Sequence, residues 1–279
     1  MKQDTPFAAI ELPPERSTQK PRKTGLTMMA DWGLPLRHQE DMLGLGGRYV
    51  DFAKIVTGTA RLYDLQYLKD KLALYQAHQV RPFIGGQFFE YVLATKGWDA
   101  LPAFFDEACG IGFQTIEISD NCIPLADEER SAAVSLASRH GLNVMGEVGS
   151  KVDANDVDVL IAQARQFFEA GAEYVLVEAA ELVEDGQPKS EMLDALRDGL
   201  DLRKVMIELP GPWIHGVTLS LVQDLKKAII AAFGADVNLA NIHAEDLIAT
   251  EALRVGLGVV GPTTRVAGSS APALAAAHR

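Results

Sequence analysis

The sequence has few cysteines and no long apolar run. Only Cys109 and Cys122 occur among its 279 residues, and their spacing excludes a disulfide framework and a zinc site. We therefore expect a reducing, cytoplasmic compartment. The longest apolar stretches, at 204–210 and 228–234, fall well short of the ~20 residues that a membrane-spanning helix needs. The first residues contain no apolar segment of signal-peptide length, so we expect no export signal.

Basic residues are also scarce relative to acidic ones. Lysine and arginine number 26 against 38 aspartates and glutamates, for a formal charge of −12. This balance argues against a nucleic-acid-binding protein, which needs a basic face. A small anionic substrate remains compatible, because a local site can differ from the net charge. The 48% of hydrophobic and 23% of charged residues are typical of a soluble globular chain without a membrane partner.

What the sequence does contain is a repeated pattern of a short β-branched run followed by a stretch of helical periodicity. The runs recur roughly every 30 residues, the length that a strand, a helix and two loops require. They lie at 25–31, 49–55, 81–86, 115–119, 143–149, 174–179, 204–210 and 237–242. Two clear helical stretches are 64–79 and 156–172, and Gly171 is suited to end the second one.

Eight such units predict an α/β fold with a single (β/α)8 TIM barrel. We assign the barrel to residues 21–260, with a flexible N-terminal tail at 1–20 and a flexible C-terminal tail at 261–279. A doubly wound open sheet is the alternative. No dinucleotide-type glycine fingerprint follows the first run, which makes the alternative weaker.

Carboxylates stand at the ends of several predicted strands, where a barrel of this kind carries its active site. Glu117, Glu147, Glu178 and Glu208 interrupt or end runs that should be apolar in a buried parallel sheet. One such glutamate could simply cap a helix or pair with a base. Four from four strands favour a shared site, which a hard cation such as Mg2+ or nearby lysines would stabilise.

Other polar or small residues occur near the same strand ends. Lys54 lies within an apolar segment and either extends to solvent or points into a polar site, whereas Lys151 is either a site residue or a solvated loop lysine. The paired glycines after the third strand could let the backbone approach an anion. The asparagines of the last run either bind substrate or satisfy loop backbone. The substrate-binding candidates are Gly85, Gly86, Ser119, Asn238 and Asn241.

Several segments in register resemble the phosphosulfolactate synthase family. EVGSK at 147–151, EIS at 117–119 and VNLANI at 237–242 form the most specific part of the signature. Further matching segments are KPRKTGLTMMAD at 20–31, YVDFAK at 49–54 with GT at 58–59, GGQFFE at 85–90, AGAEYVLVEAAE at 170–181 and IELP at 207–210. The resemblance covers about residues 20–257.

The resemblance implies a TIM barrel that adds sulfite to phosphoenolpyruvate, gives phosphosulfolactate and requires Mg2+. In methanogens this reaction opens coenzyme M biosynthesis. The resemblance suggests Lys151 and Lys54 as general acid or anion-binding residues, and the four glutamates as metal or electrostatic ligands. The expected partners are phosphoenolpyruvate and sulfite or their analogues, and we expect a homo-oligomer.

The chain departs from the family pattern at several strand ends. Ala180 stands where the family typically has an arginine, a natural bidentate partner for phosphate or sulfonate. Gln87 and Phe88 replace a Thr-Leu pair, and the segments at 56–59 and 208–213 also differ. Two alternatives therefore stay open: a divergent paralogue that acts on another small anion, and a non-catalytic, stress-related protein on the same scaffold.

Overall fold

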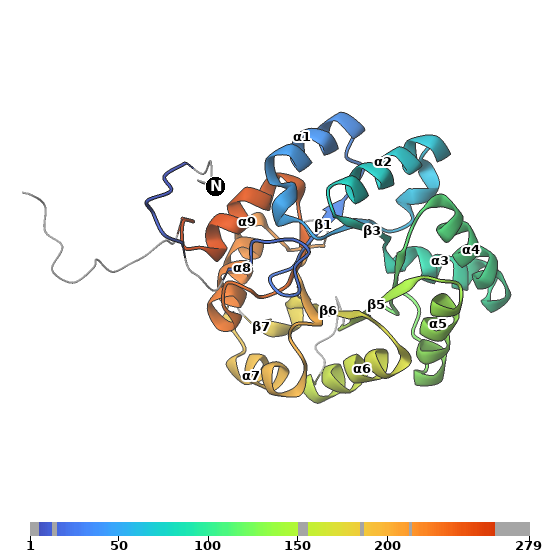
Figure 1. Cartoon of the computed structure of the whole chain (residues 1–279). Coiled ribbons are helices and arrows are strands. Elements are labelled where there is room, and N and C mark those ends of the chain that lie inside the picture. Colours follow the sequence, from blue (N-terminus) through green and yellow to red (C-terminus); the bar gives the residue numbers. More distant parts are fainter. Residues whose placement is uncertain (1–5, 13–15, 150–155, 185–186, 212–213, 260–279) are drawn as a thin grey trace, which may run out of the picture.

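The computed structural model describes residues 6–12, 16–149, 156–184, 187–211 and 214–259. Eight parallel strands form a closed barrel in the order β1-β10-β9-β6-β5-β4-β3-β2 (Figure 1). Because β1 pairs with both β2 and β10, the open sheet is ruled out and the predicted TIM barrel is confirmed. The barrel strands are β1 (Thr27–Asp31), β2 (Phe52–Ile55), β3 (Arg81–Ile84), β4 (Thr115–Ile118), β5 (Asn143–Val148), β6 (Tyr174–Glu178), β9 (Val205–Glu208) and β10 (Leu239–Ile242).

Helices surround the barrel and connect its strands (Figure 1). Helix α2 begins where the Asp64 carboxylate accepts hydrogen bonds from two backbone N–H groups, and α6 ends at Gly171 with a φ of 110°. The helices are α1 (Leu36–Gly46), α2 (Leu65–Ala77), α3 (Gly86–Lys96), α4 (Leu101–Ile111), α5 (Asp127–Arg139), α6 (Val157–Ala170), α7 (Ser190–Gly199), α8 (Leu219–Phe233) and α9 (Leu247–Arg254). A small hairpin of β7 (Val183–Glu184) and β8 (Gln187–Pro188) lies outside the barrel sheet.

The barrel interior has an apolar layer with a polar layer beside it. The apolar layer is a separate core cluster of Leu26, Met28, Phe52, Phe83, Met145, Leu176, Met206 and Ala240. Alternate residues of a strand point to the same face. Lys54 and Glu147 therefore point to the same face as Phe52 and Met145, which stand two positions before them. In the same way, Glu178 follows Leu176 and Glu208 follows Met206. The strand period thus directs these charged side chains inward, at the C-terminal end of the barrel.

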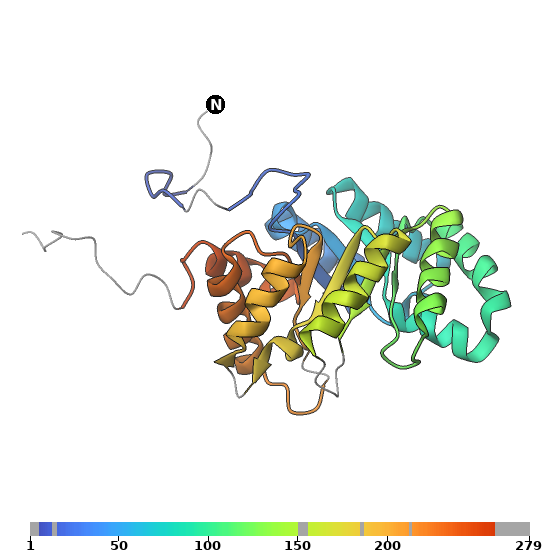
Figure 2. The ribbon, with the colours of Figure 1, turned by 90° about the horizontal axis from the view of Figure 1, so that it is seen from below.

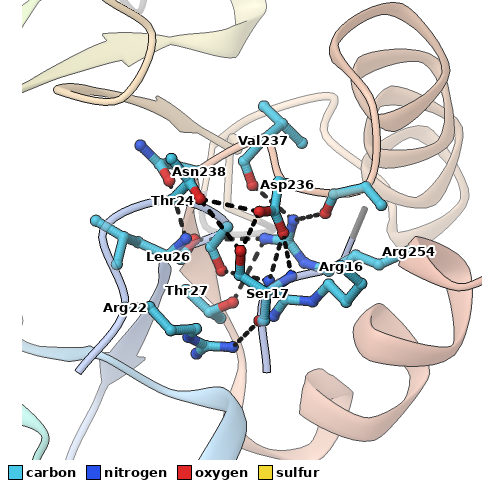
Figure 3. A network of polar contacts seen from close by, with 12 residues as sticks. Arg16, Ser17, Arg22, Thr24, Leu26, Thr27, Asp236, Val237, Asn238 and Arg254 are labelled. Carbon is cyan, nitrogen blue, oxygen red and sulfur yellow. Dashed lines mark hydrogen bonds and ion pairs between the residues drawn. The ribbon is translucent and has the colours of Figure 1, made fainter. Parts of the chain in front are cut away.

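Residues 16–25 cover the opposite end of the barrel, away from the β7–β8 hairpin (Figure 2). Arg16 donates to both carboxylate oxygens of Glu251 at 2.8 and 2.9 Å. Asp236 accepts hydrogen bonds from the backbone and side chain of Ser17 (Figure 3). The predicted tail at 1–20 is thus too long, because packing against the barrel begins by Arg16. Its C-terminal counterpart at 261–279 lies outside the described residues. No helix in the described ranges has the length and apolarity to cross a membrane.

Candidate active site

A buried lysine joins two of the inward-facing glutamates. Lys54 Nζ lies 2.8 Å from Oε2 of Glu117 on β4 and 3.2 Å from Oε1 of Glu208 on β9. All three side chains are almost fully buried. Buried charges of this kind are tolerated when they are paired and hydrogen-bonded. The lysine therefore points into the polar layer rather than out to solvent.

This arrangement raises the pKa values of Lys54 and Glu117. Burial alone would lower the pKa of Lys54, but the surrounding Glu117, Glu208 and Glu147 outweigh it and raise that pKa above its usual value. Burial is also the largest influence on Glu117. Together with repulsion from Glu147 and Glu208, and against the attraction of Lys54, it raises the pKa of Glu117 to about 8. The protonated form of Glu117 is thus favoured more than in an ordinary glutamate, and a hydrogen bond with Glu147 contributes to this.

Three glutamates on consecutive strands of the barrel form a cluster suited to a cation. Glu147 on β5, Glu178 on β6 and Glu208 on β9 each place a carboxylate oxygen within 4.8 Å of the other two. All three are buried, and Glu208 Oε2 has no hydrogen-bond partner among the described residues. Oxygen ligands of this charge are what Mg2+ binds in proteins. The donor set therefore fits the metal that the sequence predicts.

A cavity of about 200 Å3 opens onto this polar layer. Asn241 lies at its edge with a φ of 60°, and its Nδ2 donates to Glu208 Oε1 at 2.6 Å and to the Leu209 carbonyl at 3.2 Å. A non-glycine residue in this left-handed region is uncommon and often marks a functional position. The lining residues are Trp32, Lys54, Val56, Thr57, Gly86, Gln87, Glu117, Glu147, Glu208, Ile214 and Asn241. Its size suits a small anionic molecule.

The two glycines after β3 allow helix α3 to approach the site closely. A Cβ on Gly86 would stand 2.2 Å from Ser119 Oγ and 2.9 Å from Glu117 Oε1. The Gly86 N–H donates to Glu117 Oε1 at 2.9 Å, and the Gly85 N–H donates to the Ile55 carbonyl at 3.0 Å. Both amides thus donate within the protein, while Gly86 itself lines the cavity and brings the backbone of α3 close to it.

Ser119 lies beside the polar layer but is engaged by a buried acid. Its hydroxyl donates to Glu90 Oε1 at 2.5 Å, while Glu90 Oε2 accepts hydrogen bonds from the N–H groups of Cys122 and Ile123 at 2.6 and 2.9 Å. Glu90 on α3 therefore holds the loop that follows β4. Ser119 is not one of the described residues that line the 200 Å3 cavity.

Asn238 lies at the wrong end of the barrel for a substrate-binding residue. Its Oδ1 accepts a hydrogen bond from the Leu26 N–H at 2.9 Å, and its Nδ2 donates to the Val205 carbonyl at 2.9 Å. It also bonds the carbonyls of Leu202 and Arg203. These partners stand at the beginnings of strands, so the prediction that Asn238 converges with the glutamates is wrong. The side chain satisfies loop backbone instead.

Some residues of the prediction lie outside what the structure describes, and some lining residues were not predicted. Lys151 lies outside the described residues, and so does the side chain of Ala180. Trp32, Thr57 and Gln87 line the cavity without having been singled out as site residues. Each stands within three residues of a strand's C-terminal end, which is the signal that could have identified them.

Comparisons with known proteins show what this chain is similar to. Residues 15–259 match the family described as (2R)-phospho-3-sulfolactate synthase. The phosphosulfolactate synthase of Methanocaldococcus jannaschii is 34% identical over 84% of this chain and 92% of its own length, and that of Methanothermobacter thermautotrophicus is 32% identical over 88% and 94%. The carboxyl transferase domain of Rhizobium etli pyruvate carboxylase, solved with pyruvate, is 14% identical with a TM-score of 0.54. The match covers 81% of this chain and 41% of that one, and it reflects the fold alone.

Proposed function

The chain belongs to the phosphosulfolactate synthase family of enzymes, and from this premise we propose that it catalyses the Mg2+-dependent addition of sulfite to phosphoenolpyruvate. In this reaction a C–S bond forms at the terminal carbon of the double bond. A proton is added to the neighbouring carbon, which carries the phosphate, and the product is phosphosulfolactate. The observation that carries the proposal is the polar layer, in which one buried lysine and four buried glutamates lie close together, and the lysine and three of the glutamates line a small cavity.

Within this layer, Glu147, Glu178 and Glu208 would hold the metal ion. When bound, Mg2+ supplies positive charge that stabilises the enolate-like charge developing on the substrate carboxylate. Asn241 orients Glu208 through its 2.6 Å hydrogen bond. The apolar layer beneath the site separates these groups from the other end of the barrel.

The two candidate lysines would have different roles. Lys54 holds its proton tightly because three glutamates surround it, so it is better suited to orient an anionic substrate than to donate a proton. We therefore assign the general-acid role to Lys151, which follows β5 in the sequence. In this assignment Lys54 supplies a fixed positive charge and Lys151 donates the proton.

A second candidate function is the same type of addition to a different small anion. It is favoured by Ala180, where the resemblance predicts an arginine, and by Gln87, which lines the cavity at a position where the family usually has threonine. Both changes affect groups that would select the substrate rather than the metal-binding glutamates. Product analysis distinguishes this function from the first.

The test is an assay with phosphoenolpyruvate, sulfite and Mg2+, followed by mass spectrometry of the product. We expect phosphosulfolactate to form, EDTA to abolish the activity, and Mg2+ or Mn2+ to restore it. Glu178→Gln should weaken the binding of the metal and raise the Mg2+ concentration needed for activity, whereas Glu169→Gln, an exposed change on α6, should not. Full activity in metal-free protein would refute the metal requirement, and absence of product with active controls would refute the substrate assignment.

A further inference from the structure

The reaction cavity lacks positive charge for a phosphorylated substrate. Among the described residues that line it, Lys54 is the single cation, against Glu117, Glu147 and Glu208. Lys54 is already shared between two of these carboxyl groups. Phosphoenolpyruvate brings a carboxylate and a phosphate into this surrounding. Even with Mg2+ on the glutamates, the phosphate needs a further cation outside the polar layer.

A second cavity adjoins the first and contains such a cation. It has a volume of about 700 Å3 and lies between the loops after β2 and β4 and helix α3. Thr57 and Gln87 line both cavities, so they form the boundary between the two. Arg61 is the one lysine or arginine among the described residues lining the larger cavity. An anion that extends from the glutamate cavity past Thr57 and Gln87 therefore enters a cavity whose lining includes Arg61.

Arg61 is available for a ligand, unlike the arginines that hold the fold together. It lies on the short 3-10 helix η2 (Thr59–Leu62), and its side chain is exposed. Within the described ranges its guanidinium forms neither an ion pair nor a hydrogen bond, whereas Arg16, Arg22 and Arg130 are each paired with buried or half-buried acids. A guanidinium presents paired N–H donors that match a phosphate.

The acid of the larger cavity does not oppose an anion there. Glu90 contributes to the lining, but its two oxygens accept three hydrogen bonds, from the Ser119 hydroxyl and from two backbone N–H groups. Its charge is therefore directed into the loop after β4 rather than into the cavity. The remaining wall is largely apolar and includes Phe88 and Ile123. A weakly hydrated wall strengthens the attraction between a guanidinium and an anion.

We propose that Arg61, together with Thr57 and Gln87, forms the subsite for the phosphate group of the substrate. This inference rests on the proposed function and adds the residues that recognise the anion. It also accounts for the alanine at position 180: the cation that the family resemblance places after β6 is supplied here from the loop after β2. Arg61 would contact substrate without taking part in proton transfer.

Calorimetric titration of the Mg2+-loaded protein with phosphoenolpyruvate tests the subsite. Arg61→Gln should weaken binding by about 10- to 100-fold, the range for loss of a charge-assisted, bidentate contact, and Arg61→Lys should recover part of it. In the assay the Michaelis constant should rise similarly while kcat changes less than about threefold. Oxalate, which offers carboxylates to the metal but has no phosphate, should bind all three proteins equally. Arg37→Gln, an exposed change on α1, is the matched control.

The outcomes separate this proposal from the proposed function. If Arg61→Gln binds phosphoenolpyruvate as tightly as the wild type, the subsite is overturned while the function stands. If the wild type binds phosphoenolpyruvate without converting it and Arg61→Gln binds it weakly, the subsite stands and the function falls. Equal weakening of oxalate and phosphoenolpyruvate would show a general effect on the site, which also overturns the subsite. If the wild type binds neither ligand, both proposals fall.

Discussion

Replacing Lys54 by methionine should reveal how strongly the polar layer depends on one cation. The methionine side chain would keep much of the volume but leave the buried carboxyl groups of Glu117 and Glu208 without the ammonium now 2.8 and 3.2 Å away. Removing one partner of a buried ion pair costs about 3–5 kcal/mol. For a domain of this size, each kcal/mol lowers Tm by about 2–4 °C. Lys54→Met should therefore melt roughly 6–20 °C below the wild type in EDTA.

A second substitution identifies which carboxylate is responsible for the stability lost in Lys54→Met. Because Glu117 has a pKa raised to about 8 by burial and by neighbouring acids, it remains protonated at pH 7 in the variant. The uncompensated charge then belongs to Glu208. Lys54→Met/Glu208→Gln should regain most of the lost stability, whereas Lys54→Met/Glu117→Gln should regain little.

The measurements are thermal and urea unfolding at pH 7 in EDTA, with turnover measured separately in Mg2+. Turnover of Lys54→Met should fall by about 10²-fold or more, because a fixed positive charge that orients the substrate is lost. A melting temperature equal to that of the wild type would contradict the ion-pair argument. Equal recovery by the two double variants would contradict the protonation state assigned to Glu117.

Four further changes test other parts of the structure. Gly86→Ala should destabilise the protein by about 1–3 kcal/mol or more and lower its activity, because the added Cβ would stand 2.2 Å from Ser119 Oγ. The control is Gly44→Ala on α1, where the added Cβ meets nothing within 4 Å. In urea unfolding this control should stabilise the protein by about 0.5–1 kcal/mol. Since burial first of all raises the pKa of Glu117 from 4.5 to about 8, the folded state retains a proton that the unfolded state loses. This contribution to the free energy of unfolding is complete below pH 4.5 and is lost as the pH rises to 8. The loss amounts to at most about 1.4 kcal/mol per pH unit. In metal-free protein, Glu117→Gln should make the free energy of unfolding depend less on pH in this range. Asn238→Ala should cost about 2 kcal/mol or more yet leave the Michaelis constants unchanged, the opposite of what a substrate-binding residue would do. Lys151→Met should lower turnover by about 10²-fold without rescue by arginine, which does not release its proton near neutral pH; unaltered turnover would remove this lysine from the mechanism.

The strand period explains why much of the site could be predicted from the sequence. A glutamate at the end of an apolar run must lie near the C-terminal edge of the sheet, and runs about 30 residues apart predict a barrel that brings those edges together. Glu117, Glu147, Glu178 and Glu208 therefore converge as expected. The pairing of Lys54 with Glu117 and Glu208 could not be predicted in this way, because it depends on contacts across the barrel.

The two asparagines of the last strand show where prediction from sequence ends. The sequence pattern predicts a strand at 237–242, whereas β10 comprises Leu239–Ile242. Asn238 thus precedes the strand, and Asn241 lies one residue before its end. Three residues of extended backbone separate them by about 10 Å, enough to place one at the base of the barrel and one at the cavity. Strand boundaries uncertain by two residues therefore decide whether an amide is structural or faces the site.

The distribution of charge along the barrel axis separates stability from function. At the beginnings of the strands, arginines meet acids in bidentate pairs: Arg22 holds both oxygens of Asp51 at 3.0 and 2.6 Å, and Arg16 holds both oxygens of Glu251. At the other end lie four buried glutamates and one buried lysine, and the lysine pairs with two of them, Glu117 and Glu208. At the N-terminal end of the strands the protein's own arginines neutralise the acids. Among the described residues at the C-terminal end, the buried glutamates outnumber the cations, and a bound metal ion would offset this excess of negative charge. Added Mg2+ should consequently raise the melting temperature of the wild type, and it should raise that of Lys54→Met more, because in that variant the metal replaces the positive charge that Glu208 has lost.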